Sequence, residues 1–155
     1  MLDRSVIDRF EAGGDAVVAS LQGLSRQDLL AFPVAGKMSI QQVIIHLADS
    51  DMVLTDRMKR VLTQDNPPLL AFDHDGYVKE LSYDEQSAQD AATVFKLNRQ
   101  NLAKALRKLP DAAFDRIGTH NERGPMKLIE ILTMAANHAT HHLKFVAEKR
   151  AKLGK

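Results

Sequence analysis

The chain of 155 residues has 45% hydrophobic residues, with 21 lysines and arginines against 20 acidic residues and a formal net charge of +1. This length and apolar content suit a single domain, spanning residues 1–155, with a buried core of its own. The nearly balanced charge gives no electrostatic reason to expect nucleic acid or an anionic membrane as a partner.

Cysteine is absent from the sequence. Disulfides, thiolate metal ligands and a cysteine nucleophile are therefore excluded, and any bound metal must use nitrogen and oxygen ligands. The N-terminus lacks an apolar run of signal-peptide length, and no apolar stretch approaches the roughly 20 residues of a membrane span. We therefore expect a cytoplasmic protein that does not insert into a membrane.

The first half of the chain predicts two long helices. Apolar spacing indicates one helix over about 3–24, although Gly13 and Gly14 interrupt it and each mid-helix glycine costs about 1 kcal/mol relative to alanine. A short helical turn and a loop follow. Ser39 is a predicted N-cap, and Gln42 completes a capping box for a helix that runs to about residue 62.

The second half predicts two more helices, over about 84–108 and 126–151. The connection 63–82 contains Pro and Gly signals and is long enough to be a functional loop that covers or lines a site. No stretch alternates with period two over enough residues to indicate a strand. We therefore predict an all-α four-helix bundle with long crossover loops, a fold whose core often holds metal sites.

Three of the six histidines lie in the last predicted helix. His138 and His142 are four residues apart, so their side chains share one helix face and are close enough to share a metal ion. With His138 set at zero on a helical wheel, the apolar direction lies at about 80°, His142 at about 40° and His141 at about −60°. The wheel therefore predicts His138 and His142 as the inward pair and His141 as a solvent-facing neighbour. The alternative is a pair of half-buried histidines without a metal.

His46 is the best candidate for a third ligand, because it is the other histidine within a long helical pattern and lies at the edge of an apolar arc. Asp51 falls inside that arc, where an unpaired carboxylate is costly, so we expect it to pair with a ligand histidine or a helix terminus. His120 precedes the last helix and is a candidate acid, base or pocket residue. His74, between two aspartates in a loop, is expected to be an exposed turn residue.

Two well-known catalytic motifs are absent. Ala139 and Thr140 follow His138, so the helix lacks the glutamate of a zinc-protease motif, and peptide hydrolysis is disfavoured. No glycine-rich phosphate loop occurs, which argues against a nucleotide-dependent enzyme.

The sequence resembles the DinB/YfiT-like superfamily of small four-helix-bundle proteins over nearly its whole length. The matching parts are the stretch 37–50 with its histidine, the pair on the last helix, and the segments 67–77 and 120–125. The sequence departs from the family pattern at Met38, where an aromatic residue is usual, and at Tyr77, where tryptophan is common.

The resemblance implies a zinc or nickel site formed by His46, His138 and His142, the same three residues that the helical wheel selects. It also implies activities that include thiol-dependent transfer, with a low-molecular-weight thiol as cofactor, and metal-dependent hydrolysis.

The leading hypothesis is an enzyme that uses this three-histidine site to activate water or a thiol toward a small-molecule substrate. Asp51 is expected to orient a ligand, and His120 to act as an acid, base or pocket residue. One alternative is a metal-binding or small-ligand-binding stress protein without turnover. The other is a structural helical homodimer in which the histidines do not converge.

Overall fold

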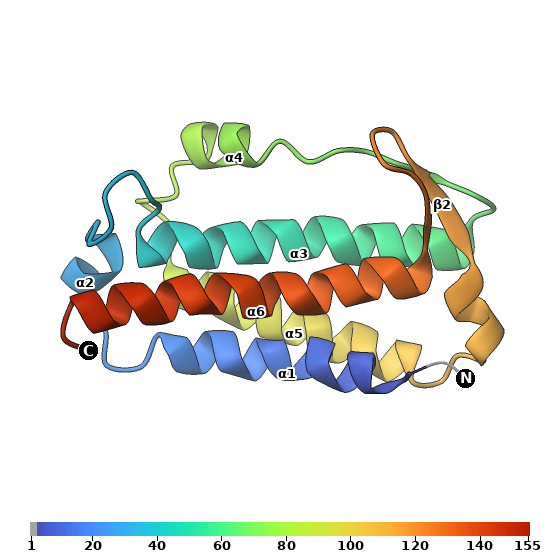
Figure 1. Ribbon diagram of the computed structural model, residues 1–155, viewed down its shortest axis with the longest axis horizontal. Coiled ribbons are helices and arrows are strands. Elements are labelled where there is room, and N and C mark those ends of the chain that lie inside the picture. Colours follow the sequence, from blue (N-terminus) through green and yellow to red (C-terminus); the bar gives the residue numbers. More distant parts are fainter. Residues whose placement is uncertain (1–2) are drawn as a thin grey trace.

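The computed structural model describes residues 3–155. Four long helices form a bundle (Figure 1): α1 (Ser5–Ser20), α3 (Ile40–Thr63), α5 (Ala88–Leu106) and α6 (Leu128–Lys152). The predicted four-helix bundle is confirmed, and each helix lies within a few residues of its expected range. Within the described residues, no helix has both the length and the apolar character needed to cross a membrane.

The direction of the helices explains the long connections. As Figure 1 shows, α1 and α6 run one way along the bundle and α3 and α5 run the other way. α3 packs against both α5 and α6, and so does α1. Because α3 and α5 are parallel neighbours, the chain between them must travel back along the length of the bundle.

That return path, residues 64–87, carries the strand β1 (Pro68–Leu69) and the helix α4 (His74–Glu80), and α4 contacts α3. Asp73 caps α4 by accepting a hydrogen bond from the backbone N–H of Gly76. A second short helix, α2 (Arg26–Leu30), follows α1.

The prediction that the chain has no strands is wrong. β1 pairs in parallel with β2 (Ile117–His120), and β2 pairs antiparallel with β3 (Gly124–Lys127) after the 3₁₀ turn Asp111–Asp115. These strands have two or four residues, too few for alternation to stand out from the sequence. The small sheet lies at one end of the bundle, beside the end of α3 (Figure 1).

The glycine pair in α1 does not break the helix, and it lies where α1 and α5 come close together. A Cβ on Gly14 would lie 2.9 Å from the Cα of Lys96, and one on Gly13 would lie 2.6 Å from Nη1 of Arg99. Both distances are too short for a real side chain. The glycines are therefore explained by helix packing rather than by a turn.

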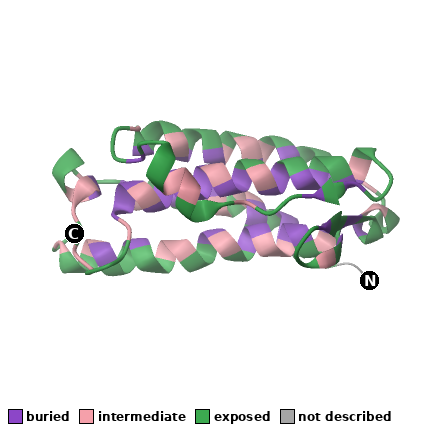
Figure 2. Ribbon diagram, turned by 90° about the horizontal axis from the view of Figure 1, so that it is seen from above, coloured by how far each residue is buried: buried purple, intermediate pink, exposed green. Residues whose placement is uncertain are grey.

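The core consists of two apolar clusters with a polar layer between them. Figure 2 shows the buried positions on the inward faces of the helices. One cluster contains Met58 and Leu102, and the other contains Leu47 and Phe95. Along α3 and α5, the residues between these clusters include the buried Asp51 and Arg99. On α6, His138 lies between the same two clusters, after Ala136 and before Ala139.

Candidate metal centre

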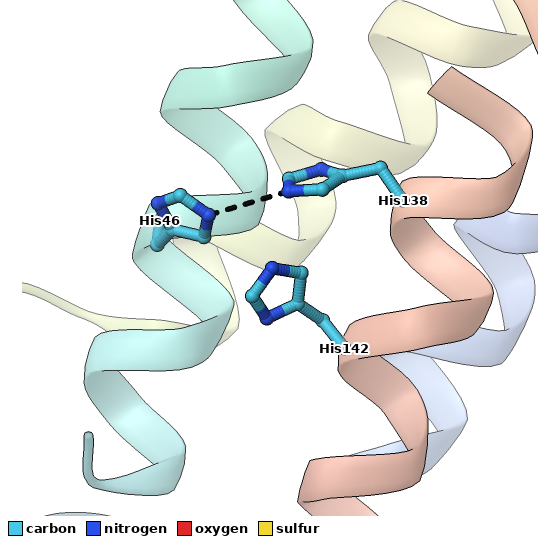
Figure 3. Close-up of side chains that lie close together, drawn as sticks. All are labelled: His46, His138 and His142. Atoms are coloured by element: carbon cyan, nitrogen blue, oxygen red, sulfur yellow. Dashed lines mark hydrogen bonds between the residues drawn. The ribbon is translucent and has the colours of Figure 1, made fainter. Parts of the chain in front are cut away.

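Three histidines converge beside this polar layer, and Figure 3 shows their rings pointing toward one another from two helices. His138 and His142 lie on successive turns of α6, and His46 faces them from the antiparallel neighbour α3. One ring nitrogen from each residue lies within 4.8 Å of the others. The structure thus brings together the three residues that were predicted from the sequence. His46 and His138 meet although they are 92 residues apart in the chain.

The geometry and chemistry of the cluster fit a divalent cation. The Nε2 atoms of His46 and His138 are 3.4 Å apart. Tetrahedral zinc, with metal–nitrogen bonds of about 2.0–2.1 Å, separates its ligand nitrogens by about 3.3 Å. The Nδ1 atom of His142 is buried and has no hydrogen-bond partner. A buried ring nitrogen without a partner is costly unless something binds in its place.

The electrostatic environment keeps these three imidazoles neutral. Burial, followed by the neighbouring histidines, lowers the pKa of His46 to about 4. The same causes lower the pKa of His138 to about 3, with a smaller contribution from Arg99. Burial and then His141 lower the pKa of His142 to about 4. Since metals bind the unprotonated imidazole, the ring nitrogens are ready to coordinate at neutral pH.

Asp51 is buried, as expected, but its partner is neither a candidate ligand histidine nor a helix terminus. Its Oδ1 accepts a hydrogen bond from Nε of Arg99 at 2.8 Å, and its Oδ2 accepts one from Asn98 at 3.1 Å. Burial raises the pKa of the Asp51 carboxyl, and the Arg99 guanidinium opposes that shift. Arg99 was not predicted to be a buried residue, because nothing in its local sequence pattern distinguishes it from a surface arginine.

Arg99 links the polar layer to the backbones of α1 and α6. Its Nη2 donates to the carbonyl oxygen of Ala135 and its Nη1 to that of Phe10, at 2.8 and 2.9 Å. Ala135 lies three residues before His138 on α6. Through Arg99, Asp51 therefore fixes the backbone that carries a candidate ligand, which is an indirect role rather than a contact with the site.

A cavity of about 670 Å³ opens beside the histidine cluster and includes His138 in its wall. Its lining combines a few apolar side chains with several polar and charged ones: Ser50, Val53, Leu54, Arg57, Ala71, Phe72, Asp73, His74, His120, Glu122, Arg123, Met134 and His138. The connection 64–87 forms one side of it. The connection was expected to cover or line a site, and it does line this cavity.

His120, the last residue of β2, is buried in the wall of this cavity. Its Nδ1 accepts a hydrogen bond from the backbone N–H of Glu122 at 3.1 Å, so in the neutral ring Nε2 carries the proton. Burial lowers the pKa of His120, and the nearby charges of Arg57 and Arg123 lower it further.

His74 is exposed, as expected, but it is not remote from the site. Its ring centroid lies 5.1 Å from that of His46, and it lines the cavity. Phe72 packs against His74 with centroids 4.3 Å apart. The length of the connection was the one sequence signal that pointed to a role for this segment. The position of His74 beside His46 could not be predicted, because residues 64–87 have no periodic pattern. His141 is exposed on α6, as the wheel predicted.

A family model describing the DinB superfamily matches residues 9–146. The chain belongs to the DinB superfamily. The resemblance inferred from the sequence is thus confirmed over most of its length.

Relatives in the DinB superfamily carry names that refer to metals. A protein of Oceanobacillus iheyensis named "Putative metal-dependent hydrolase" is 27% identical over 112 residues, covering 72% of this chain and 64% of the relative. One from Geobacillus thermodenitrificans with the same name is 25% identical over 141 residues, covering 90% of this chain and 79% of the relative. The chain therefore spans somewhat less than two thirds of the first relative's length.

The DinB fold is also seen in solved structures. YfiT from Bacillus subtilis, described as "a probable metal-dependent hydrolase with an unusual four-helix bundle topology", aligns with a TM-score of 0.90 at 21% identity, covering 97% of this chain and 86% of that one. A DinB-like protein from the same species, YjoA, aligns with a TM-score of 0.70 at 13% identity, covering 97% and 93%. At these identities the similarity establishes the fold.

Proposed function

We propose that this chain is a metal-dependent enzyme that acts on a small molecule, with His46, His138 and His142 holding a divalent cation such as zinc or nickel. The observation that carries the proposal is the convergence of three neutral imidazoles beside an open cavity. Among residues 3–155, no carboxylate or further histidine joins that group. A site of three protein ligands leaves positions for water or substrate, as catalytic sites do.

A divalent cation at this position supplies Lewis-acid activation of a water or a thiol at neutral pH. Hydrolysis of a small molecule and transfer to a low-molecular-weight thiol both use that chemistry, and the names of the relatives support the hydrolytic version. The side chains of the cavity wall then bind and orient the substrate.

His120 is the proposed hydrogen-bond donor of the cavity wall. Its Nδ1 is occupied by the backbone N–H of Glu122, so the Nε2–H of the neutral ring is free to donate a hydrogen bond to a substrate oxygen and to stabilise negative charge that develops there. Asp51 is proposed as a positioning residue, because it holds Arg99 against the backbone that carries His138. Neither role requires contact with the metal.

Elemental analysis of the protein purified without a histidine tag tests the ligand assignment. We expect about one divalent ion per chain, lost in His46→Ala and in His142→Ala. His141→Ala is the matched control, since this exposed residue is adjacent on the same helix and should leave the metal content unchanged. Stoichiometric metal in both ligand variants would refute the site.

A screen of small esters, amides and electrophiles, with and without low-molecular-weight thiols, tests for turnover. We expect a reaction that metal removal abolishes and metal return restores. Turnover indifferent to metal would contradict the mechanism. Stoichiometric metal with no turnover across the screen would favour the non-catalytic binding protein.

A further inference from the structure

Two arginines lie in the wall of the cavity without an acidic partner. Arg57 is on α3 and Arg123 is in the turn between β2 and β3. Within residues 3–155, neither guanidinium has a carboxylate oxygen within 4.0 Å. Arginine is rarely buried unless it is paired with an acidic group, so an unpaired and buried arginine in a cavity wall needs an explanation.

Arg57 is the buried one, with 9% of its surface exposed. Its Nη2 donates to the carbonyl oxygen of Leu70, which fixes the guanidinium against the connection 64–87. Its Nε is buried and has no hydrogen-bond partner. Burial lowers the pKa of Arg57, and the neighbouring charge of Arg123 lowers it further, so the two cations lie close enough to repel each other.

The two arginines act on a neighbouring residue of the cavity wall. Arg57 and Arg123 both lower the pKa of His120, and the opposing effect of Glu122 is smaller. The acidic side chains of the lining are Asp73 and Glu122. Asp73 is committed to capping α4, and Glu122 is exposed. Neither neutralises the arginines by direct contact.

The backbone of Arg57 is set apart from that of His46 along α3. Arg57 follows His46 by eleven residues, so their Cα atoms are separated by about three turns, or about 16 Å, on the same helix face. His138 and Arg57 line the same cavity. A molecule that fills it can therefore contact both His138 of the candidate metal site and the two arginines.

We propose that the substrate carries an anionic oxygen group, a carboxylate or a phosphate, at the end remote from the reacting group, and that Arg57 and Arg123 bind it. A guanidinium offers paired donors that match both kinds of anion, and Arg57 does not use its Nε on any partner among residues 3–155. This inference rests on the proposed function for the reacting end of the molecule. The anion site itself depends only on the arginines.

Calorimetric titration of the metal-free protein with inorganic phosphate and, separately, with malonate tests the anion site. We expect saturable binding of at least one of them, and the tighter of the two identifies the anion type. Arg57→Gln and Arg123→Gln should each weaken it, by about tenfold for the buried Arg57. Arg60→Gln is the matched control, because it removes the same charge from α3 at an exposed position paired with Asp56. We expect it to change the affinity less than about twofold.

Arg123 is exposed, so Arg123→Gln should keep the fold even if replacing Arg57 disturbs the contact with Leu70. Wild-type affinity in Arg123→Gln and Arg57→Gln would overturn the proposal, as would the absence of saturable binding for both anions. His142→Ala separates the two proposals. It should lose metal and keep anion binding, whereas lost anion binding would place the anion at the histidines and overturn the arginine site. Metal retained in that variant would refute only the metal site.

Discussion

Asp51 and Arg99 form an ion pair at 2.8 Å, with 1% and 0% of their side chains exposed. The pair joins α3 to α5, and the remaining guanidinium donors bind carbonyls of α1 and α6, so one residue contacts all the other long helices. Replacing one partner leaves a buried charge without compensation. We expect Asp51→Ala and Arg99→Ala each to lower the free energy of unfolding by about 3–5 kcal/mol.

Urea unfolding followed by circular dichroism measures this loss. The double variant Asp51→Leu with Arg99→Met should be less damaged than the sum of the single alanine variants, because it leaves neither charge unpaired. Asp15→Ala is a control, since it breaks the exposed pair with Lys96 and should cost far less. Equal costs for the buried and exposed pairs would contradict the assigned role of the polar layer.

Gly14→Ala tests the close packing of α1 on α5. Alanine is the better helix former by about 1 kcal/mol, so helix propensity alone predicts stabilisation. The added Cβ would lie 2.9 Å from the Cα of Lys96, and backbone cannot yield as a flexible side chain can. We expect a net loss of about 1–3 kcal/mol, measured as a lower melting temperature.

The control for this substitution is Ala16→Gly, two residues further along α1 at an exposed position. It should cost about 1 kcal/mol through propensity alone. If Gly14→Ala instead raised the melting temperature, the helix contact would be looser than described.

Metal binding should stabilise the folded chain. A ligand that binds only the native state adds about 2.7 kcal/mol when its free concentration is one hundred times its dissociation constant. We expect added zinc or nickel to raise the melting temperature of the metal-free protein and of His141→Ala, and to have little effect on His138→Ala. A similar shift in all three proteins would point to binding elsewhere.

The metal-free protein should lose stability as the pH falls below about 6.5. The folded pKa values of His46 and His142 are about 4 and that of His138 is about 3, whereas an unfolded histidine titrates near 6.5. Between these values the unfolded chain binds more protons than the folded one. The stabilisation is therefore complete above about pH 6.5 and is lost toward pH 4, at about 1.4 kcal/mol per pH unit for each buried histidine.

Unfolding in urea at several pH values between about 7 and 5 measures this slope. His46→Gln removes one of the buried titrating groups and should reduce the slope, with His141→Gln as the matched exposed substitution. An unchanged slope in His46→Gln would mean that the pKa of His46 is the same in the folded and unfolded protein.

The long helices could be predicted from sequence because their signals are local. The apolar periodicity and the Ser39 capping box with Gln42 each lie within a few turns, and the structure has that cap. The helical wheel likewise placed His138 and His142 on the inward side and His141 outward, since the orientation of a residue on a straight helix depends only on its own position.

The parts that escaped prediction depend on contacts between distant segments. β1 forms only because the connection after α3 meets the segment before α6, and Pro68 pairs with Thr119. Arg99 looks like a surface residue until α5 docks and Asp51 meets it. His74 reaches the site through an irregular path that no period describes. In each case the information lies in tertiary geometry rather than in local spacing.

The wall of the cavity and the candidate metal site differ in how firmly their backbone is held. The candidate ligands are on two long helices of the core, whereas α4 buries none of its residues. Segments with few buried contacts open at a small fraction of the global unfolding free energy. We therefore expect backbone amides of α4 to exchange with solvent far sooner than those of α3, so that the cavity can admit and release ligands while the metal ligands keep their positions.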